Sequence, residues 1–189
     1  MKRYKIITII LSVIIIIESI ILFSLCRVTQ KKKVIKPKPS AAAALKGKIA
    51  IVLDDWGYSL NNLVILKQIK YPLTLSVLPN LHFSRKVSEE AHFLGIQVIL
   101  HLAMEPHEKI RLERNTIMNS MDEATISNIL IDDLNNIAYA KGVSNHMGSS
   151  ATENTRTMSI IFKELKERKL FFLDSLVTSN SITTQLADK

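Results

Sequence analysis

The chain has 189 residues and a formal net charge of +8, which leaves room for one domain of ordinary size. Eleven of its 25 basic residues lie in residues 1–48 beside a single acid, Glu18, so residues 49–189 carry 14 basic and 16 acidic groups. Such a near-neutral domain argues against a nucleic-acid-binding face. Because Cys26 is the only cysteine, a single chain can form neither a disulfide nor a zinc site built from cysteines.

Residues 6–25 are apolar apart from four hydroxyl residues and Glu18, and they follow a short basic start. A helix of this length spans about 30 Å, the thickness of the hydrocarbon core of a bilayer. No small-residue cleavage site follows, and Leu25 before Cys26 does not suit a lipoprotein signal. We therefore expect residues 1–26 to form an uncleaved signal anchor with one transmembrane helix; a cleaved signal peptide is the alternative.

Basic residues flank this segment on both sides, three before it and six after it. Counted alone, they favour a cytoplasmic position for the C-terminal side and leave the topology open. Residues 27–47 alternate Lys with Pro and then run through alanines, which predicts a flexible basic linker. The domain is expected to cover residues 48–189.

From Lys48 onward, short apolar runs alternate with segments of helical periodicity. The apolar runs predict strands at residues 48–53, 73–78, 96–102, 143–144 and 170–173. The periodic segments predict helices at residues 59–69, 84–94, 122–138, 155–168 and from 181 onward. Alternation of strand and helix predicts an α/β fold with parallel strands joined by right-handed crossovers.

Polar residues cluster where these strands are expected to end. Because the carboxyl ends of parallel strands share one edge, we expect these side chains to converge there. The set consists of Asp54, Asp55, Asn80, His101, Glu105, Asn145, His146, Asp174 and Ser175. The alternative for each is an ordinary cap or a hydrogen-bonded structural residue.

One carboxylate and two imidazoles from different strands make a suitable ligand set for a divalent metal such as zinc. We assign Asp55, His101 and His146 to that set. A zinc ion with three protein ligands keeps a position open for water and lowers its pKa to about 7. Asp54 is then the candidate general base. His82, His92 and His107 fall in expected loops or mid-helix and are left out.

Four further residues are candidates for supporting roles. Glu105 could orient a ligating histidine or cap a turn. Asn145 and Ser149 could contact substrate or hold a loop, and Asp174 could bond a catalytic group or cap a helix.

Five segments of the chain resemble, in order, motifs of the divergent polysaccharide deacetylase family. They are residues 49–58, 72–79, 100–106, 142–149 and 171–175. The fourth contains Asn145-His146-Met147-Gly148-Ser149, which matches a signature of that family, whereas Ala103 in the third replaces its usual Pro. The resemblance covers roughly residues 48 to 185.

The resemblance implies a NodB-like (β/α) barrel that hydrolyses acetyl groups on sugars outside the cytoplasm. Carried over by position, Asp55, His101 and His146 would bind the metal and Asp54 would be the base. Two features depart from the family: Leu176 follows Asp174-Ser175 where the family usually has Arg, and the sequence ends at Lys189. From the second we expect an incomplete barrel, in a fragment or a C-terminally truncated product.

Together these observations predict a zinc-dependent carbohydrate deacetylase, single-pass in the inner membrane with its domain in the periplasm. The substrate would be a polysaccharide or peptidoglycan. The alternative is a non-catalytic envelope protein that keeps the fold to bind a glycan or a protein.

Overall fold

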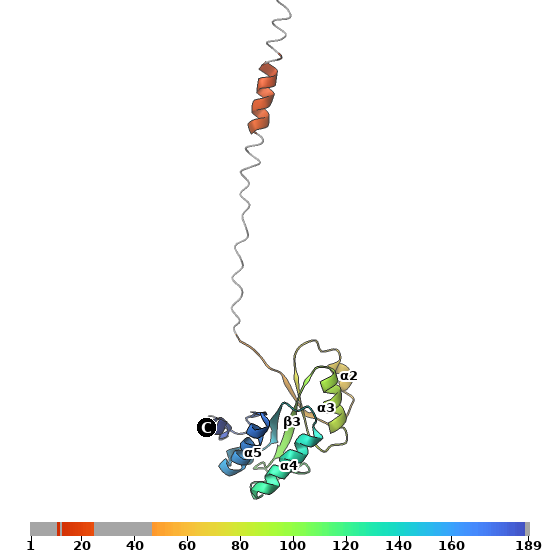
Figure 1. Ribbon diagram of the computed structural model, residues 1–189, viewed down its shortest axis with the longest axis vertical. Helices are drawn as coiled ribbons and strands as arrows, with labels where there is room; N and C mark the ends of the chain where they lie inside the picture. The colour runs from red at the N-terminus through yellow and green to blue at the C-terminus, as the bar shows by residue number, and fades with distance from the viewer. Residues whose placement is uncertain (1–10, 12, 25–46, 188–189) are drawn as a thin grey trace, which may run out of the picture. The chain divides into compact units, whose positions relative to one another are not determined.

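The computed structural model describes residues 11, 13–24 and 47–187. The chain divides into two units, residues 1–48 and 49–189. In the first unit, residues 11 and 13–24 are helical and exposed (Figure 1). Within the described residues, no helix combines the length and the apolar character needed to cross a membrane. The expected anchor at residues 1–26 lies partly outside the described residues, and the expected linker at residues 27–47 lies almost wholly outside them.

The second unit is built on one five-stranded sheet with its strands in sequence order (Figure 1). Every neighbouring pair is parallel, which confirms the predicted α/β class. The strands are β1 (Val52–Trp56), β2 (Thr74–Val77), β3 (Gln97–Met104), β4 (Gly142–Met147) and β5 (Phe171–Leu173).

Helices follow the strands along the chain. They are α2 (Leu63–Leu66), α3 (Ser84–Phe93), α4 (Glu123–Asn136), the 3-10 helix η1 (Ala151–Glu153), α5 (Thr155–Arg168) and α6 (Thr183–Ala187). Helix α5 has the predicted bounds because Asn154 caps its first turn and Lys169 ends it in a left-handed conformation. Asp122 caps α4 by accepting a hydrogen bond from the Thr125 N–H at 2.7 Å.

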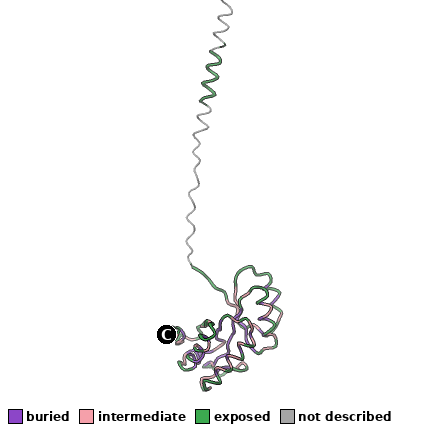
Figure 2. Tube along the Cα trace, viewed as in Figure 1, coloured by how far each residue is buried: buried purple, intermediate pink, exposed green. Residues whose placement is uncertain are grey.

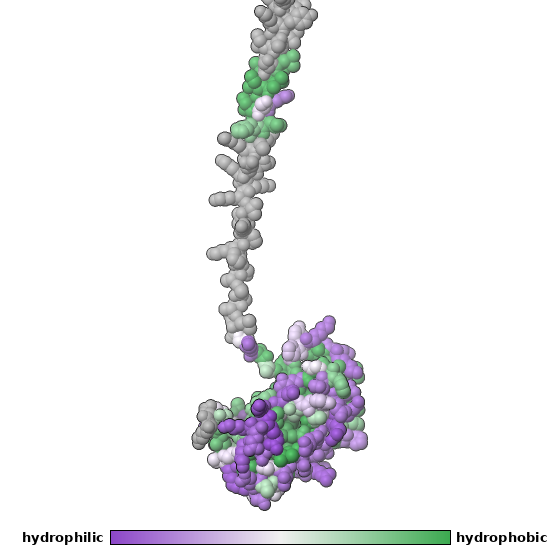
Figure 3. Space-filling view, in the orientation of Figure 1, coloured by the Kyte–Doolittle hydropathy of each residue, from purple (hydrophilic) through white to green (hydrophobic). Residues whose placement is uncertain are grey.

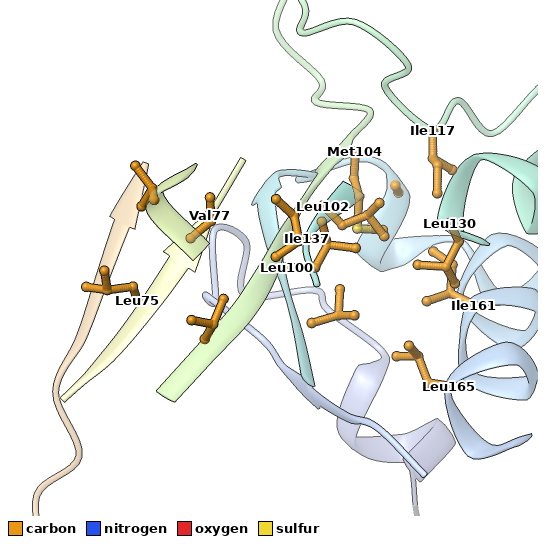
Figure 4. Close-up of a cluster of buried hydrophobic side chains, with 14 of the residues drawn as sticks. Leu75, Val77, Leu100, Leu102, Met104, Ile117, Leu130, Ile137, Ile161 and Leu165 are labelled. Atoms are coloured by element: carbon orange, nitrogen blue, oxygen red, sulfur yellow. The ribbon is translucent and has the colours of Figure 1, made fainter. Parts of the chain in front are cut away.

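One face of the sheet packs against helices α3, α4 and α5 to form the core. Alternate residues of β2, β3 and β4 point to this face, among them Leu75, Leu100 and Val143. Figure 4 shows Leu100, Leu102 and Met104 between the sheet and helical residues such as Leu130 and Ile161. The longer buried stretches of the trace in Figure 2 include residues 98–104 of β3 and 142–145 of β4, and shorter ones lie along the helices. Hydrophilic residues cover much of the face visible in Figure 3.

The opposite face, called here the inner face, carries the residues of the other parity. In the registered strands these include Ser76, Ile99, His101, Ala103, Ser144 and His146. Ser76 and Ser144 approach to 2.6 Å between hydroxyl oxygens although β3 lies between their strands. Neighbouring strands lie about 4.8 Å apart, so two serines could not meet across a flat sheet. The sheet therefore curls toward the inner face, as a barrel wall does.

Several predicted boundaries are wrong in an informative way. The strand predicted at 48–53 is β1 at 52–56, because its pairing with β2 begins at Val52↔Thr74. The Asp pair thus lies inside the strand and not after it. Strand β4 extends over residues 142–147, well beyond the predicted 143–144, because it pairs with β3 as far as Met104↔Met147. His101 and His146 are accordingly strand residues, near the carboxyl ends.

The helix predicted at residues 59–69 shortens to the four residues of α2. The turns on either side of α2 contain hydrogen bonds between residues three positions apart. In one of them the Leu63 N–H donates to the Leu60 carbonyl at 3.1 Å. Only Leu63 and Leu66 are buried in α2, so tertiary packing holds little more than one turn.

Candidate metal centre

Asp55 reaches the inner face because β1 contains a β-bulge. Leu53 pairs with Leu75, whereas Trp56 pairs with Val77, so β1 has one residue more than β2 over this step. Asp55 takes up the extra length with a φ of 62°, in the left-handed region that Asp tolerates better than most residues. The bulge turns its carboxylate toward β3 and β4.

Three predicted ligands meet at this point. Asp55 Oδ1 lies 3.2 Å from His101 Nε2 and 3.1 Å from His146 Nδ1. The three candidate ligand atoms all lie within 4.8 Å of one another. The imidazole rings stand edge to face, with centroids 5.0 Å apart at 70°. His101 is 3% exposed, whereas the Asp55 side chain is 59% exposed, so the group is buried at β3 and open to solvent at β1.

On the side of the ring away from Asp55, His101 contacts a pair of buried serine hydroxyls. His101 Nδ1 lies 2.9 Å from Ser144 Oγ, which lies 2.6 Å from Ser76 Oγ. Both serines are fully buried. Burial lowers the pKa of His101, against the nearby charge of Asp54, which raises it. The neutral imidazole, the form that binds metals, is thereby favoured.

His146 lacks such support. Its Nε2 is buried and has no hydrogen-bond partner among the described residues. A buried polar atom without a partner is unusual in a folded protein and calls for an explanation. With His146 Nδ1 and His101 Nε2 both facing Asp55 Oδ1, the donor set is two nitrogens and one oxygen. This set fits a divalent ion such as zinc, which takes three protein ligands in catalytic sites.

Asp54, the predicted base, lies beside this group. Its charge acts on His101, and it lines a hollow of about 450 Å³ together with Asp55 and the turn that follows β1. A larger hollow of about 580 Å³, between α5, β5 and α6, is mostly apolar. Its one acid, Asp174, already accepts hydrogen bonds from three groups, and none of the three candidate ligands lines this hollow.

The other predicted residues hold the surrounding loops. Glu105 accepts a hydrogen bond from the Asn119 N–H. Ser149 accepts one from the His107 N–H at 2.9 Å. Among the described residues, neither side chain bonds to the three candidate ligands.

Asn145 and Asp174 likewise fix the segment that follows β5. The Asn145 Oδ1 accepts a hydrogen bond from the Ser175 N–H at 2.8 Å. The Asp174 carboxylate accepts hydrogen bonds from the Leu176 N–H and from the Ser181 and Thr183 hydroxyls. Asn80 was predicted to join the same group but contacts α4 instead. Its Nδ2 donates a hydrogen bond to Asp133 Oδ1 at 2.6 Å.

A loop after β3 is tied to the turn beside the candidate centre. The Tyr58 hydroxyl donates to Glu113 Oε1 at 2.6 Å. This hydrogen bond to a carboxylate is the main reason that the pKa of Tyr58 rises to about 12. The Asp55 charge acts in the same direction, and Tyr58 and Asp55 line the same hollow.

The sequence analysis did not predict roles for Ser76 and Ser144 or the hydrogen bond between Tyr58 and Glu113. A signal for the serines exists, because each interrupts an apolar strand at a position of inner-face parity, next to residues expected to be buried.

The protein-family model described as divergent polysaccharide deacetylase matches residues 51–189. Among curated proteins, the chain is similar to the uncharacterized protein YibQ of Escherichia coli strain K12, with 36% identity over 75% of this chain and 44% of YibQ. An uncharacterized protein of Haemophilus influenzae is 29% identical over 75% of this chain and 51% of its own length. The chain thus spans about half the length of these curated relatives.

A crystal structure of the uncharacterized protein ATU2773 from Agrobacterium tumefaciens C58 has a similar fold. The TM-score is 0.68 at 19% identity, and the match covers 74% of this chain and 58% of that one. At this identity the likeness shows a shared fold alone.

Proposed function

The chain belongs to the divergent polysaccharide deacetylase family, and on that premise we propose that it is a metal-dependent deacetylase of acetylated sugars in a polysaccharide or peptidoglycan. The observation that carries the proposal is the convergence of Asp55, His101 and His146 from three strands onto ligand atoms within 4.8 Å of one another. The curl of the sheet toward this group supports a NodB-like barrel as the complete fold.

The residues of the centre divide into two roles. Asp55, His101 and His146 hold the ion, which when bound supplies a polarised water and a positive charge beside the acetyl carbonyl. Asp54 accepts the proton of the attacking water as general base. Its exposure and its place in the hollow next to Asp55 support that role. The positive charge of the ion also offsets the repulsion between the two adjacent carboxylates.

The test begins with zinc titration of the chelator-stripped full chain in detergent, followed by calorimetry. The wild type and His82→Ala, a control at an exposed histidine outside the centre, should bind one zinc ion each. His146→Ala and Asp55→Asn should bind it more weakly by over 100-fold, beyond the roughly 10- to 100-fold that outer-shell changes cause. Absence of stoichiometric zinc, or equal binding by all four proteins, contradicts the proposal.

Turnover is measured as acetate released from acetylated chito-oligosaccharides and from peptidoglycan. Asp54→Asn should keep zinc affinity and lose acetate release, because it removes the base and not a ligand. Zinc binding without acetate release from either substrate would favour the second candidate, a glycan-binding envelope protein. Leu176, exposed and standing where the family usually carries Arg, is the observation that favours that candidate.

For location, we propose that residues 6–25 anchor the chain in the inner membrane with the domain in the periplasm. Their apolar composition, the basic residues on both sides and a substrate in the cell envelope support this proposal. Protease added to spheroplasts should digest the domain while residues 1–25 stay with the membrane pellet. A domain protected from protease in intact spheroplasts would contradict it.

A further inference from the structure

We propose that Ser144 and Ser76 form a positioning pair that fixes the tautomer of His101 and so presents its Nε2 to the metal ion. The metal part of this inference rests on the proposed function. The tautomer part can be tested without metal once the Asp55 carboxylate, which faces Nε2, is removed. The pair contacts neither substrate nor ion and acts through His101.

The contact follows from the strand register. His101 and Ser144 are direct partners in the β3–β4 pairing, so their side chains share the inner face side by side. Their polar atoms lie 2.9 Å apart. Ser76 comes from β2 on the other side of β3, and its hydroxyl closes the chain at 2.6 Å. Three strands thus contribute to one line of hydrogen bonds.

The line of hydrogen bonds has a direction. His101 Nε2 faces Asp55 and can bind a metal only through its lone pair, which requires the ring proton to be on Nδ1. Nδ1–H then donates to Ser144 Oγ, and Ser144 donates its own hydrogen to Ser76 Oγ. The reverse direction would place the proton on Nε2 and block the ligand atom. Ser76 therefore matters because it accepts the hydrogen of Ser144 and leaves the Ser144 oxygen free to accept from the imidazole.

Burial makes the arrangement selective. Ser76 and Ser144 are 0% exposed, and His101 is 3% exposed. With bulk solvent excluded, the ring depends on the hydroxyl, and an unpaired Nδ1–H would be left buried. His146 is in that unpaired condition, since its Nε2 has no partner among the described residues. The two histidines therefore differ: His101 is held from behind, and His146 is free to adjust to the ion.

The rival explanation is that the serines only join β2 to β4 and stabilise the curl. Ser88→Ala is the matched control, because Ser88 is also fully buried and bonded by its hydroxyl, but to the Arg85 carbonyl in α3. A structural role predicts that Ser144→Ala and Ser88→Ala differ only in thermal stability. A positioning role predicts a change at His101 that Ser88→Ala does not share.

The metal-free readout is the imidazole tautomer, measured by long-range ¹H–¹⁵N NMR on the chelator-stripped full chain. Every protein in this comparison carries Asp55→Gly, because the Asp55 carboxylate, 3.2 Å from His101 Nε2, would otherwise accept a hydrogen bond from Nε2–H when no metal is bound. Asp55→Gly alone, and together with Ser88→Ala, should show His101 as the Nδ1–H form. Adding Ser144→Ala should give a mixture of both tautomers, and adding Ser76→Ala a smaller change in the same direction. An Nε2–H form in Asp55→Gly, or an unchanged tautomer after Ser144→Ala is added, overturns the proposal.

The second readout is zinc affinity, with the visible spectrum of the cobalt-substituted protein as a reporter of geometry. Ser144→Ala should weaken zinc binding by about 10- to 100-fold, the range for residues behind a metal ligand. Ser76→Ala should weaken it less, and Ser88→Ala should not change it. Wild-type zinc affinity in Ser144→Ala overturns the proposal. If wild-type chain binds no zinc, the proposed function fails by itself, because the tautomer result still decides the role of the serines.

Discussion

Asp133 of α4 carries a carboxyl group in a buried position that disfavours its charged form. The residue is 1% exposed. Oδ1 accepts a hydrogen bond from Asn80 Nδ2, but Oδ2 is buried without a hydrogen-bond partner among the described residues. Burial raises the pKa of Asp133 from 3.8 to about 7, although the Asn80 bond acts the other way. We predict that Asp133→Asn stabilises the protein at neutral and alkaline pH.

The sign and the magnitude of this change in the free energy of unfolding follow from proton linkage. Between pH 4 and 7 the folded state holds the Asp133 proton and the unfolded state does not, so stability falls as pH rises through this window. A shift of about 3 pKa units at about 1.4 kcal/mol each sets a ceiling of about 4 kcal/mol, reached above pH 7. The Asn variant should gain less than this ceiling, because its amide nitrogen takes the place of the unpaired Oδ2.

The assay is urea unfolding of the full chain at pH 5 and at pH 8, followed by circular dichroism. Asp132→Asn, at an exposed neighbour on the same helix, is the control for general charge effects. The stability difference between Asp133→Asn and the wild type should be larger at pH 8 by about 2 to 3 kcal/mol, because part of the effect is already present at pH 5. A difference that is equal at the two pH values, or matched by Asp132→Asn, would refute the reasoning.

Three further predictions concern two turns and one helix cap of the domain. Gly57→Ala should destabilise the fold by about 1 to 3 kcal/mol in thermal unfolding, because φ is 125° there; a loss under 0.5 kcal/mol would contradict the need for glycine. Asp122→Ala should cost about 1 kcal/mol by freeing the Thr125 N–H, and equal stability would show that water caps α4 as well. Tyr58→Phe should release Glu113 and speed amide exchange in residues 107–115 without changing zinc affinity; unchanged exchange would show that other contacts hold the loop.

The sequence allowed the parallel sheet and the three candidate ligands to be predicted, because both depend on local patterns. Apolar runs indicated the strands, and polar residues at their ends indicated a shared edge. The bulge at Asp55 could not be foreseen, because it arises from the pairing of β1 with β2 and leaves no mark in the order of residues. The extent of β4 was missed for the same reason: its ladder to β3 sets its length.

The roles of buried polar residues were also not predicted from the sequence. Ser76 and Ser144 look like ordinary polar breaks in apolar strands until their register places them against His101. Asp133 did leave a trace, since it falls on the helical face of Ile126, Leu130 and Ile137, all of them buried. An acid at a core position of an amphipathic helix is therefore a signal worth reading.

The left-handed backbone at Asp55 restricts how this centre can change during evolution or engineering. At a φ of 62°, Asn, Asp and His are the side-chain-bearing residues best tolerated, and β-branched or bulky residues are strained. Replacing Asp55 with Glu or Cys to recruit another metal would therefore strain the backbone before any ligand bond formed. Positions 101 and 146 lie in regular strands and carry no such constraint. Exchange of a candidate ligand is therefore least restricted at the two histidines, whereas the backbone at Asp55 favours Asn or His as replacements.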